Sequence, residues 1–188
     1  MKKHICPWYV GYLLANPLRR LFQNPKNILR PFIKEGMTIL EVGPGMGFFS
    51  LPLAKFVGET GRVVCVDLQE KMIKSLRRRA DKAGLLTRIE TRLSTETSLQ
   101  IDDLREKVDF ALAFAVVHEV SDPKKLFTQI FNSLKREGML LVSEPTGHVT
   151  KGEFDTMLSI AQSAGLKILD TLNIARSHSV TLSKISDF

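Results

Sequence analysis

The stretch that most constrains this chain is a glycine-rich loop at residues 41–47, Glu-Val-Gly-Pro-Gly-Met-Gly. A strand-like run, 37–40, precedes the loop, and an apolar run of helical character, 48–56, follows it. Gly43, Gly45 and Gly47 stand at every second position, which favours a tight turn that a ligand can approach closely. The N-terminus of the following helix offers free N–H groups. The pattern predicts a nucleotide-type loop at the end of a first parallel strand.

Two features of this loop argue against a dinucleotide ligand. The dinucleotide fingerprint requires a third glycine three positions after the second, and Phe48 occupies that position. Glu41 stands two residues before Gly43, at the end of the strand. A carboxylate there would repel a pyrophosphate but would suit a ligand that carries a positive charge.

Strands and helices alternate along the rest of the chain. Strand-like runs occupy 62–66, 89–93, 108–115 and 139–143, and helical runs follow at 70–83, after Pro123 and around Phe154. Two final strands, 166–172 and 179–185, are joined by a short polar link that predicts a hairpin. This order predicts an α/β fold with a mostly parallel seven-stranded sheet, helices on both faces and an antiparallel C-terminal hairpin.

Residues 1–35 read as an N-terminal helical arm before a main domain at 36–188. Asn16-Pro17 and Asn24-Pro25 each place a capping side chain before a proline at the first position of a short helix. Trp8 and Tyr12 are four residues apart and would share one face of a helix. They either pack the arm onto the domain or form an aromatic lid over the pocket.

Three polar residues follow predicted strands, at the edge of the sheet where ligands bind in open α/β folds. Asp67 lies 20 residues beyond Gly47, close to the spacing at which a carboxylate meets a ribose in nucleotide-binding βαβ units. It could also cap the next helix, and the two roles are compatible. His118 follows the apolar run 108–115, and Glu144 follows the fifth strand.

The pattern acid-x-Gly-x-Gly-x-Gly at Glu41 to Gly47 resembles motif I of the class I S-adenosylmethionine-dependent methyltransferases. The resemblance covers residues 36–188, and four features match in order: the glycine loop, Asp67, the buried strand ending near His118, and Gly138 before the fifth strand. It implies S-adenosyl-L-methionine as cofactor, with Glu41 near its amino group and Gly43, Gly45 and Gly47 along its methionine portion. Asp67 would bind the ribose hydroxyls and Leu68 would lie against adenine.

The sequence departs from this family after the third strand. The family often carries Gly-Asp-Ala there, and this chain has Ser94-Thr95-Glu96. The resemblance therefore leaves Thr95 or Glu96 to contact adenine, and it places Ala115 beside the cofactor.

The acceptor side resembles the small-molecule group of ubiquinone/menaquinone-biosynthesis methyltransferases. This placement rests on the stretch 135–141, Lys-Arg-Glu-Gly-Met-Leu-Leu, and on His118. The Asn/Asp-Pro-Pro-aromatic motif of amino-methylating nucleic-acid enzymes is absent. His118 and Glu144 are the candidate catalytic residues; a base is needed only if the acceptor must lose a proton, and His118 could instead shape its loop. His148 and Glu153 are expected at the surface.

Composition leaves two rival functions open. The chain of 188 residues carries a net charge of +7, with six cations on the predicted helix 70–83. That charge permits an RNA or protein methyltransferase that uses the basic surface, although a solvated helix face explains it as well. A nicotinamide-dependent oxidoreductase is the other rival.

The cysteines and the N-terminus bear on the compartment. Cys6 and Cys65 form neither a disulfide framework nor a CxxC metal site, so we expect a reducing, cytoplasmic environment and no metal. The apolar run 5–15 is interrupted by Pro7 and Gly11, which predicts neither a signal peptide nor a membrane span.

Overall fold

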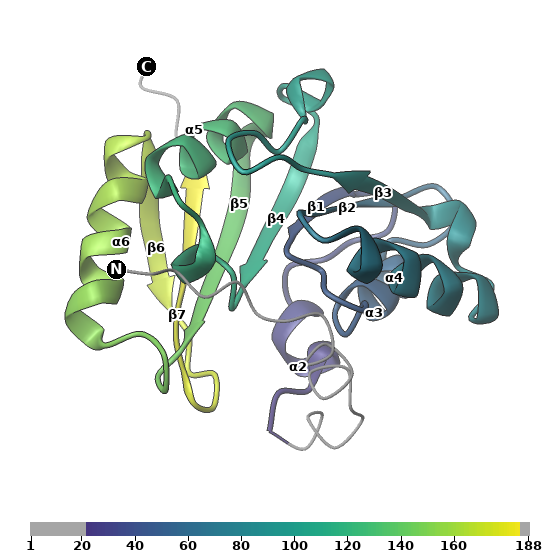
Figure 1. Cartoon of the computed structure of the whole chain (residues 1–188), viewed down its shortest axis with the longest axis horizontal. Coiled ribbons are helices and arrows are strands. Elements are labelled where there is room, and N and C mark those ends of the chain that lie inside the picture. Colours follow the sequence, from purple (N-terminus) through teal and green to yellow (C-terminus); the bar gives the residue numbers. More distant parts are fainter. Residues whose placement is uncertain (1–21, 185–188) are drawn as a thin grey trace.

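The computed structural model describes residues 22–184, which form a seven-stranded sheet with helices on both faces (Figure 1). The strand order is β3-β2-β1-β4-β5-β7-β6, so the sheet in Figure 1 runs from β6 and β7 on the left to β3 on the right. The strands are β1 (Thr38–Val42), β2 (Arg62–Asp67), β3 (Ile89–Leu93), β4 (Val108–Phe114), β5 (Leu134–Pro145), β6 (Leu166–Thr171) and β7 (Ser177–Lys184). The first five pair in parallel, and β7 is antiparallel to both β5 and β6. The predicted fold class is confirmed.

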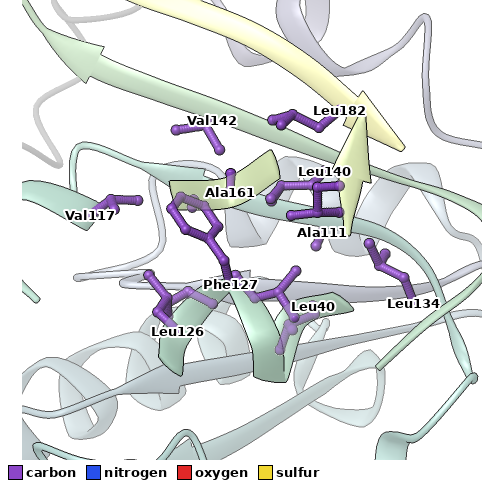
Figure 2. Packing of buried hydrophobic residues seen from close by; sticks show 14 of the residues in the cluster. Leu40, Ala111, Val117, Leu126, Phe127, Leu134, Leu140, Val142, Ala161 and Leu182 are labelled. Carbon is purple, nitrogen blue, oxygen red and sulfur yellow. The ribbon is translucent and has the colours of Figure 1, made fainter. Parts of the chain in front are cut away.

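Two layers of helices enclose the sheet. The helices α2 (Pro25–Leu29), α3 (Ser50–Phe56) and α4 (Glu70–Lys82) share one core cluster, through buried residues such as Leu29, Leu53 and Leu76. The helices α5 (Pro123–Ser133) and α6 (Lys151–Ser163) share the cluster on the other face. Figure 2 shows Phe127 of α5 in this second cluster with Ala161 of α6 and Leu140 of β5. Three short 3-10 turns, η2 (Leu86–Arg88), η3 (Asp102–Leu104) and η4 (Val117–Glu119), complete the described elements.

Local sequence signals fix the ends of most helices. Asn24 caps α2 by accepting a hydrogen bond from Lys26 N at 3.0 Å, with Pro25 at the first helical position. Asp122 caps α5 in the same manner. Thr150 and Glu153 form a capping box at the start of α6, which gives the exposed Glu153 a structural role. Asn16, Trp8 and Tyr12 lie outside the described residues.

Several element boundaries differ from the predicted ones by one to five residues, and those of α3 and β5 have a clear local cause. Helix α3 begins at Ser50 rather than Phe48, because the turn of the glycine loop extends to residue 49. Strand β5 begins at Leu134, before Gly138, and its pairing with β4 shifts register between Val108 and Phe110. A Cβ on Gly138 would lie 2.9 Å from the carbonyl oxygen of Lys135, so glycine permits the chain to fold closely on itself at this irregularity.

The predicted arm also contributes to the core. Leu29 and Ile33 are buried among residues of α3, α4 and the central strands. Arg30 donates to the carbonyl oxygen of Ile33 at 3.0 Å and stabilises the turn that follows α2. Within residues 22–184, no helix is both long and apolar enough to cross a membrane.

Candidate active site

The glycine loop joins β1 to α3 at the carboxyl edge of the sheet. Gly43, Gly45 and Gly47 all have positive φ, at 69°, 53° and 88°. A Cβ on Gly43 would lie 2.6 Å from Cγ2 of Val116, so only glycine lets the loop after β4 pack onto this turn. Gly45 differs, because a Cβ there would meet nothing within 4 Å. The surface at Gly45 is therefore open to a ligand.

Glu41 is buried at the end of β1, opposite Cys65 of β2. Its Oε2 accepts a hydrogen bond from the Cys65 thiol at 3.6 Å. Burial raises the pKa of Glu41 to about 7, and it also raises the pKa of Cys65, so the thiol keeps its proton and acts as a donor. Glu41 is thus a buried carboxyl that gives up its proton less readily than usual and that a nearby cation would ionise.

Asp67 links the glycine loop to the start of α4. Its Oδ2 accepts from Gly45 N at 3.2 Å and its Oδ1 from Gln69 N at 2.8 Å. The N-cap position of α4 is Gln69, so Asp67 supports this helix through a turn rather than as its cap. Burial raises the pKa of Asp67 to about 6, although these two backbone bonds and the nearby Leu68 N–H oppose the shift.

The cofactor half, which we define as Glu41, the glycine loop and the end of β2, fits a ligand with cationic and hydroxyl groups. Within residues 22–184, neither Glu41 nor Asp67 forms an ion pair. Leu68 follows Asp67 and is 36% exposed, which is unusual for a leucine beside buried strands. Leu93 pairs with Asp67 in register and is 48% exposed. Leu93 was not among the predicted site residues, although its position at the end of the strand next to β2 places it at the same edge of the sheet as Asp67.

The segment after β3 lies beside β2 but contributes less to this half. Ser94 N donates to the carbonyl oxygen of Asp67 at 3.0 Å, which holds the two strand ends together. The side chains of Thr95 and Glu96 are exposed. Thr95 pairs with Ser98 across a small turn, and the carbonyl oxygen of Glu96 accepts from the Ser121 hydroxyl at 3.2 Å. These contacts order the segment, and none of them joins the two side chains to the glycine loop.

Ala115 turns the chain as it leaves β4. Its φ is 56°, an uncommon value for a residue other than glycine, and its N–H donates to the carbonyl oxygen of Ser143 at 2.7 Å. This turn directs Val116 onto Gly43 and starts η4, which carries His118 and Glu119. The half-buried Ala115 therefore lies between the glycine loop and His118.

Glu144 organises the second half of the site, which we call the acceptor half: the loop 115–119 and the end of β5. Its Oε1 accepts from Val116 N at 3.2 Å and from Val117 N at 2.8 Å. Its Oε2 bonds to Nδ1 of His118. The Glu144 side chain is fully buried, so three contacts satisfy a carboxylate that water does not reach.

His118 is the more accessible partner, with 23% of its side chain exposed. The bond to Glu144 raises its pKa, and Glu119 adds to the effect. Oε1 of Glu119 lies 3.9 Å from Nε2 of His118, and the His148 ring stacks on the His118 ring at a centroid distance of 5.8 Å. His148 is exposed, as predicted from the sequence. Its stacking on His118 and the approach of Glu119 to the ring were not predicted.

The described residues 22–184 hold no group of three or more His, Cys, Asp and Glu side chains that could bind a metal ion. The contacts above instead join buried carboxylates to backbone amides, a thiol and a histidine.

Comparison with known proteins agrees with this arrangement. The family model described as a methyltransferase domain matches residues 33–176. A curated relative, the ubiquinone/menaquinone biosynthesis C-methyltransferase UbiE of Escherichia coli (strain K12 / DH10B), is 29% identical over 112 residues. That match covers 60% of this chain and 44% of the relative, so the chain spans less than half the length of the curated protein.

Solved structures extend the likeness to the whole described fold. A SAM-dependent methyltransferase from Aquifex aeolicus has a TM-score of 0.85 and 27% identity, with 96% of this chain and 100% of that chain covered. The [4+2]-cyclase SpnF has a TM-score of 0.72 at 16% identity, with 86% and 81% covered. A likeness at that identity concerns the fold alone, and SpnF illustrates that one fold supports different chemistry.

Proposed function

Because the chain belongs to the class I S-adenosylmethionine-dependent methyltransferase family, we propose that it binds S-adenosyl-L-methionine and transfers a methyl group to a small-molecule acceptor. When bound, this cofactor supplies a methyl group that the positive charge on sulfur already activates. The protein's own residues have to bind both substrates, orient the acceptor towards the methyl group and exclude water from the pocket.

One observation carries the cofactor assignment: the buried Glu41 and the half-buried Asp67 flank an open glycine, and neither has an ion-pair partner in the described chain. Desolvated carboxylates are stabilised by a cation or by hydroxyl donors. Glu41 would receive the amino group and Asp67 the ribose hydroxyls, with Gly43, Gly45 and Gly47 along the methionine portion. Leu68 and Leu93 would supply the apolar surface for adenine, and Ala115, Thr95 and Glu96 would lie around it.

The charge of the acceptor half supports a small acceptor over RNA. Glu119 and Glu144 lie there, and Asp67 feels the charge of Glu119. These acidic side chains would repel a polyanion at this edge, whereas five of the six cations of α4 are exposed. The sixth, Arg79, is half-buried and donates to the carbonyl oxygen of Met46 in the glycine loop at 2.6 Å. The likeness to a ubiquinone/menaquinone biosynthesis enzyme agrees with this choice. His118 and Glu144 would then orient the acceptor.

Calorimetry and an acceptor screen test the proposal together. We expect S-adenosylmethionine and S-adenosylhomocysteine to bind and NAD to fail. A screen of phenols, quinols, amines and thiols, followed by mass spectrometry, should then yield a product heavier by one methylene. RNA and protein substrates form the comparison arm. Methylation confined to that arm would refute the small-molecule acceptor, and binding of NAD alone would refute the cofactor.

We also propose that the N-terminal arm 1–35 covers the pocket with its residues 1–30, of which 1–21 lie outside the described residues. Where the described chain begins, Gln23 donates to Ala175 O and to Ser177 Oγ, both at 3.2 Å, and Arg176 lies over the Phe22 ring at 5.3 Å. Ser177 pairs with Pro145 at the end of β5. The arm therefore joins the domain at the carboxyl edge of the sheet, beside the acceptor half.

Deletion of residues 1–21 tests this lid. The deletion stops there because Leu29 belongs to the core. We expect the shortened protein to fold and to bind the cofactor, but to turn over poorly because water enters the pocket. Full activity of the shortened protein would exclude a lid, and failure to fold would show that the arm is part of the core.

A further inference from the structure

The His118 ring has a carboxylate facing each of its nitrogens. Nδ1 bonds to Oε2 of Glu144, and Nε2 faces Oε1 of Glu119 at 3.9 Å. The three side chains come from two segments, since His118 and Glu119 belong to η4 and Glu144 ends β5. The ring is therefore fixed by one contact and faced by a second charge on its accessible side.

Glu144 determines which ring nitrogen carries a hydrogen. Its Oε1 already accepts two backbone N–H groups, from Val116 and Val117. Such bonds favour the ionised carboxylate, which can only accept. Nδ1 of His118 must then be the donor to Oε2, which leaves Nε2 as the nitrogen that a ligand can reach.

Glu119 favours a hydrogen on Nε2 as well. At 3.9 Å the contact is longer than a hydrogen bond but close enough for charge attraction, and only 20% of the Glu119 side chain is exposed. The negative charge of Glu119 also contributes to the raised pKa of Asp67, so Glu119 lies near both halves of the site. Its charge therefore acts on both His118 and Asp67.

The other titratable groups near the ring do not reverse this balance. His148 stacks on His118 with the ring planes 15° apart, and it is exposed to solvent. His178 is the register partner of Glu144 on β7 and packs against Phe154. A positive charge on either would oppose protonation of His118, but neither contacts a ring nitrogen, whereas the two carboxylates face both. The bond to Glu144 accordingly raises the pKa of His118.

We propose that His118 acts through Nε2–H as a hydrogen-bond donor to an oxygen of the acceptor, and that Glu119 is the positioning residue that keeps the ring in this doubly protonated form. The inference rests on the proposed function and refines it. The acceptor would bring its own lone pair to the methyl carbon while the methyl–sulfur bond breaks and leaves its electron pair on sulfur. A proton on the methylated atom would pass to water, because the doubly protonated His118 cannot accept it.

This role predicts a pH dependence opposite to that of a general base. A donor is lost as the imidazolium deprotonates, so methyl transfer should fall as pH rises through the titration of His118. If His118 were instead a general base, its neutral form would be the active one, so the rate would rise over the same pH range. Glu119→Gln keeps the size of the side chain and removes its charge.

NMR titration of the imidazole protons gives a readout that does not need an acceptor. The sequence has four histidines, and His118→Asn identifies the His118 signal by its loss. We expect Glu119→Gln to lower the pH at which His118 titrates and Glu144→Gln to lower it further. Glu59→Gln is the control, since that side chain is 90% exposed and pairs with Arg88.

Rates should follow the titrations. We expect Glu119→Gln to reduce methyl transfer by roughly three- to tenfold at a pH above the titration of His118 in the variant, and by less at a pH below it, where both proteins carry the imidazolium. Glu119→Asp retains the charge and should titrate closer to wild type, which keeps the test valid if the Gln variant folds poorly. An unchanged His118 titration in Glu119→Gln, or a wild-type rate that rises through that titration, overturns the inference. If the wild-type protein binds cofactor but methylates no acceptor, the donor role falls with the proposed function, and the NMR titration still decides whether Glu119 positions the ring.

Discussion

Two buried glutamates, at the ends of the strands on either side of β4, show how differently one residue type is used in this site. Glu144 has three contacts, two from backbone N–H groups and one from His118, and all lie within the protein. Glu41 has a weak thiol donor, and its pKa is raised to about 7 by burial. A buried carboxylate whose hydrogen bonds are all made within the protein stabilises the fold. A buried carboxyl with few such partners is stabilised in its ionised form only when a ligand supplies a cation or donors.

The same contrast separates the two halves of the site. The cofactor half is preformed but incompletely neutralised, so ligand binding should alter its proton affinity. The acceptor half is internally bonded, so its residues should affect folding and reaction rate more than cofactor affinity. Substitutions at single residues of each half test this division.

The largest effect is expected for Glu144→Ala. The substitution leaves two backbone N–H groups and the His118 ring without their acceptor in a buried place. We expect a loss of about 3–5 kcal/mol in the free energy of unfolding, the range for breaking a buried charge pair. Urea denaturation measures it. Glu144→Gln retains an acceptor oxygen and should lose less stability than Glu144→Ala. Equal stability of the Ala variant and wild type would show that the carboxylate does not stabilise the fold.

The next effect concerns Glu41 and pH. The folded protein binds the Glu41 proton more tightly than the unfolded chain, because the pKa is raised from 4.5 to about 7. Its contribution to stability is therefore present below pH 4.5 and is lost as pH rises through about 7. Between these limits we expect the cofactor-free wild type to lose about 3 kcal/mol relative to Glu41→Gln.

Unfolding curves of both proteins at several pH values, without cofactor, measure this difference. Cofactor affinity of the wild type should rise over the same pH range, because the ionised carboxylate receives the cation, and the rise should be smaller in Glu41→Gln. Asp67, with a pKa of about 6, accounts for the remaining rise. A constant stability difference across the range would mean that Glu41 titrates normally and is already neutralised.

Asp67→Ala should weaken cofactor binding by about 1–3 kcal/mol, the cost of losing hydrogen bonds to a charged group. Asp67 also bonds to Gly45 N and Gln69 N, so part of the loss reflects a looser glycine loop. Isothermal calorimetry with S-adenosylhomocysteine measures the change. Asp81→Ala is the matched control on the exposed side of α4, and an equal effect in both variants would remove Asp67 from the cofactor site.

The cofactor half could be predicted from sequence because its contacts are local or follow one strand spacing. Glu41 and the three glycines lie within seven residues, and Asp67 ends the next strand. The order of strands and helices likewise followed from apolar periodicity, prolines and capping residues. These signals lie in residues close together in the sequence, so the elements could be predicted without knowledge of any tertiary contact.

The acceptor half was less predictable because its contacts are distant or involve the backbone. His118 and Glu144 could be placed at one edge, but the bonds from Val116 N and Val117 N to Glu144 depend on the turn at Ala115. Alanine gives no signal for a positive φ, unlike glycine. The approach of Glu119 to His118 follows from the 3-10 turn η4, which strand and helix periodicity does not reveal.

The smallest effect on cofactor affinity, and the sharpest test of the division between the halves, is expected at His118. The ring contacts Glu144 and lies near Glu119, and no hydrogen bond or ion pair in the described chain joins it to the glycine loop. His118→Ala should therefore leave cofactor affinity unchanged and lower methyl transfer by at least about tenfold, the modest end of positioning and acid–base effects. His118→Asn keeps an N–H donor and should retain part of the rate if hydrogen bonding is the role, but not if the ring removes a proton. Single-turnover assays with an acceptor from the screen separate the reaction step from binding. Wild-type rates in both variants would make His118 a structural residue, and a parallel loss of cofactor affinity would show that the two halves act as one unit.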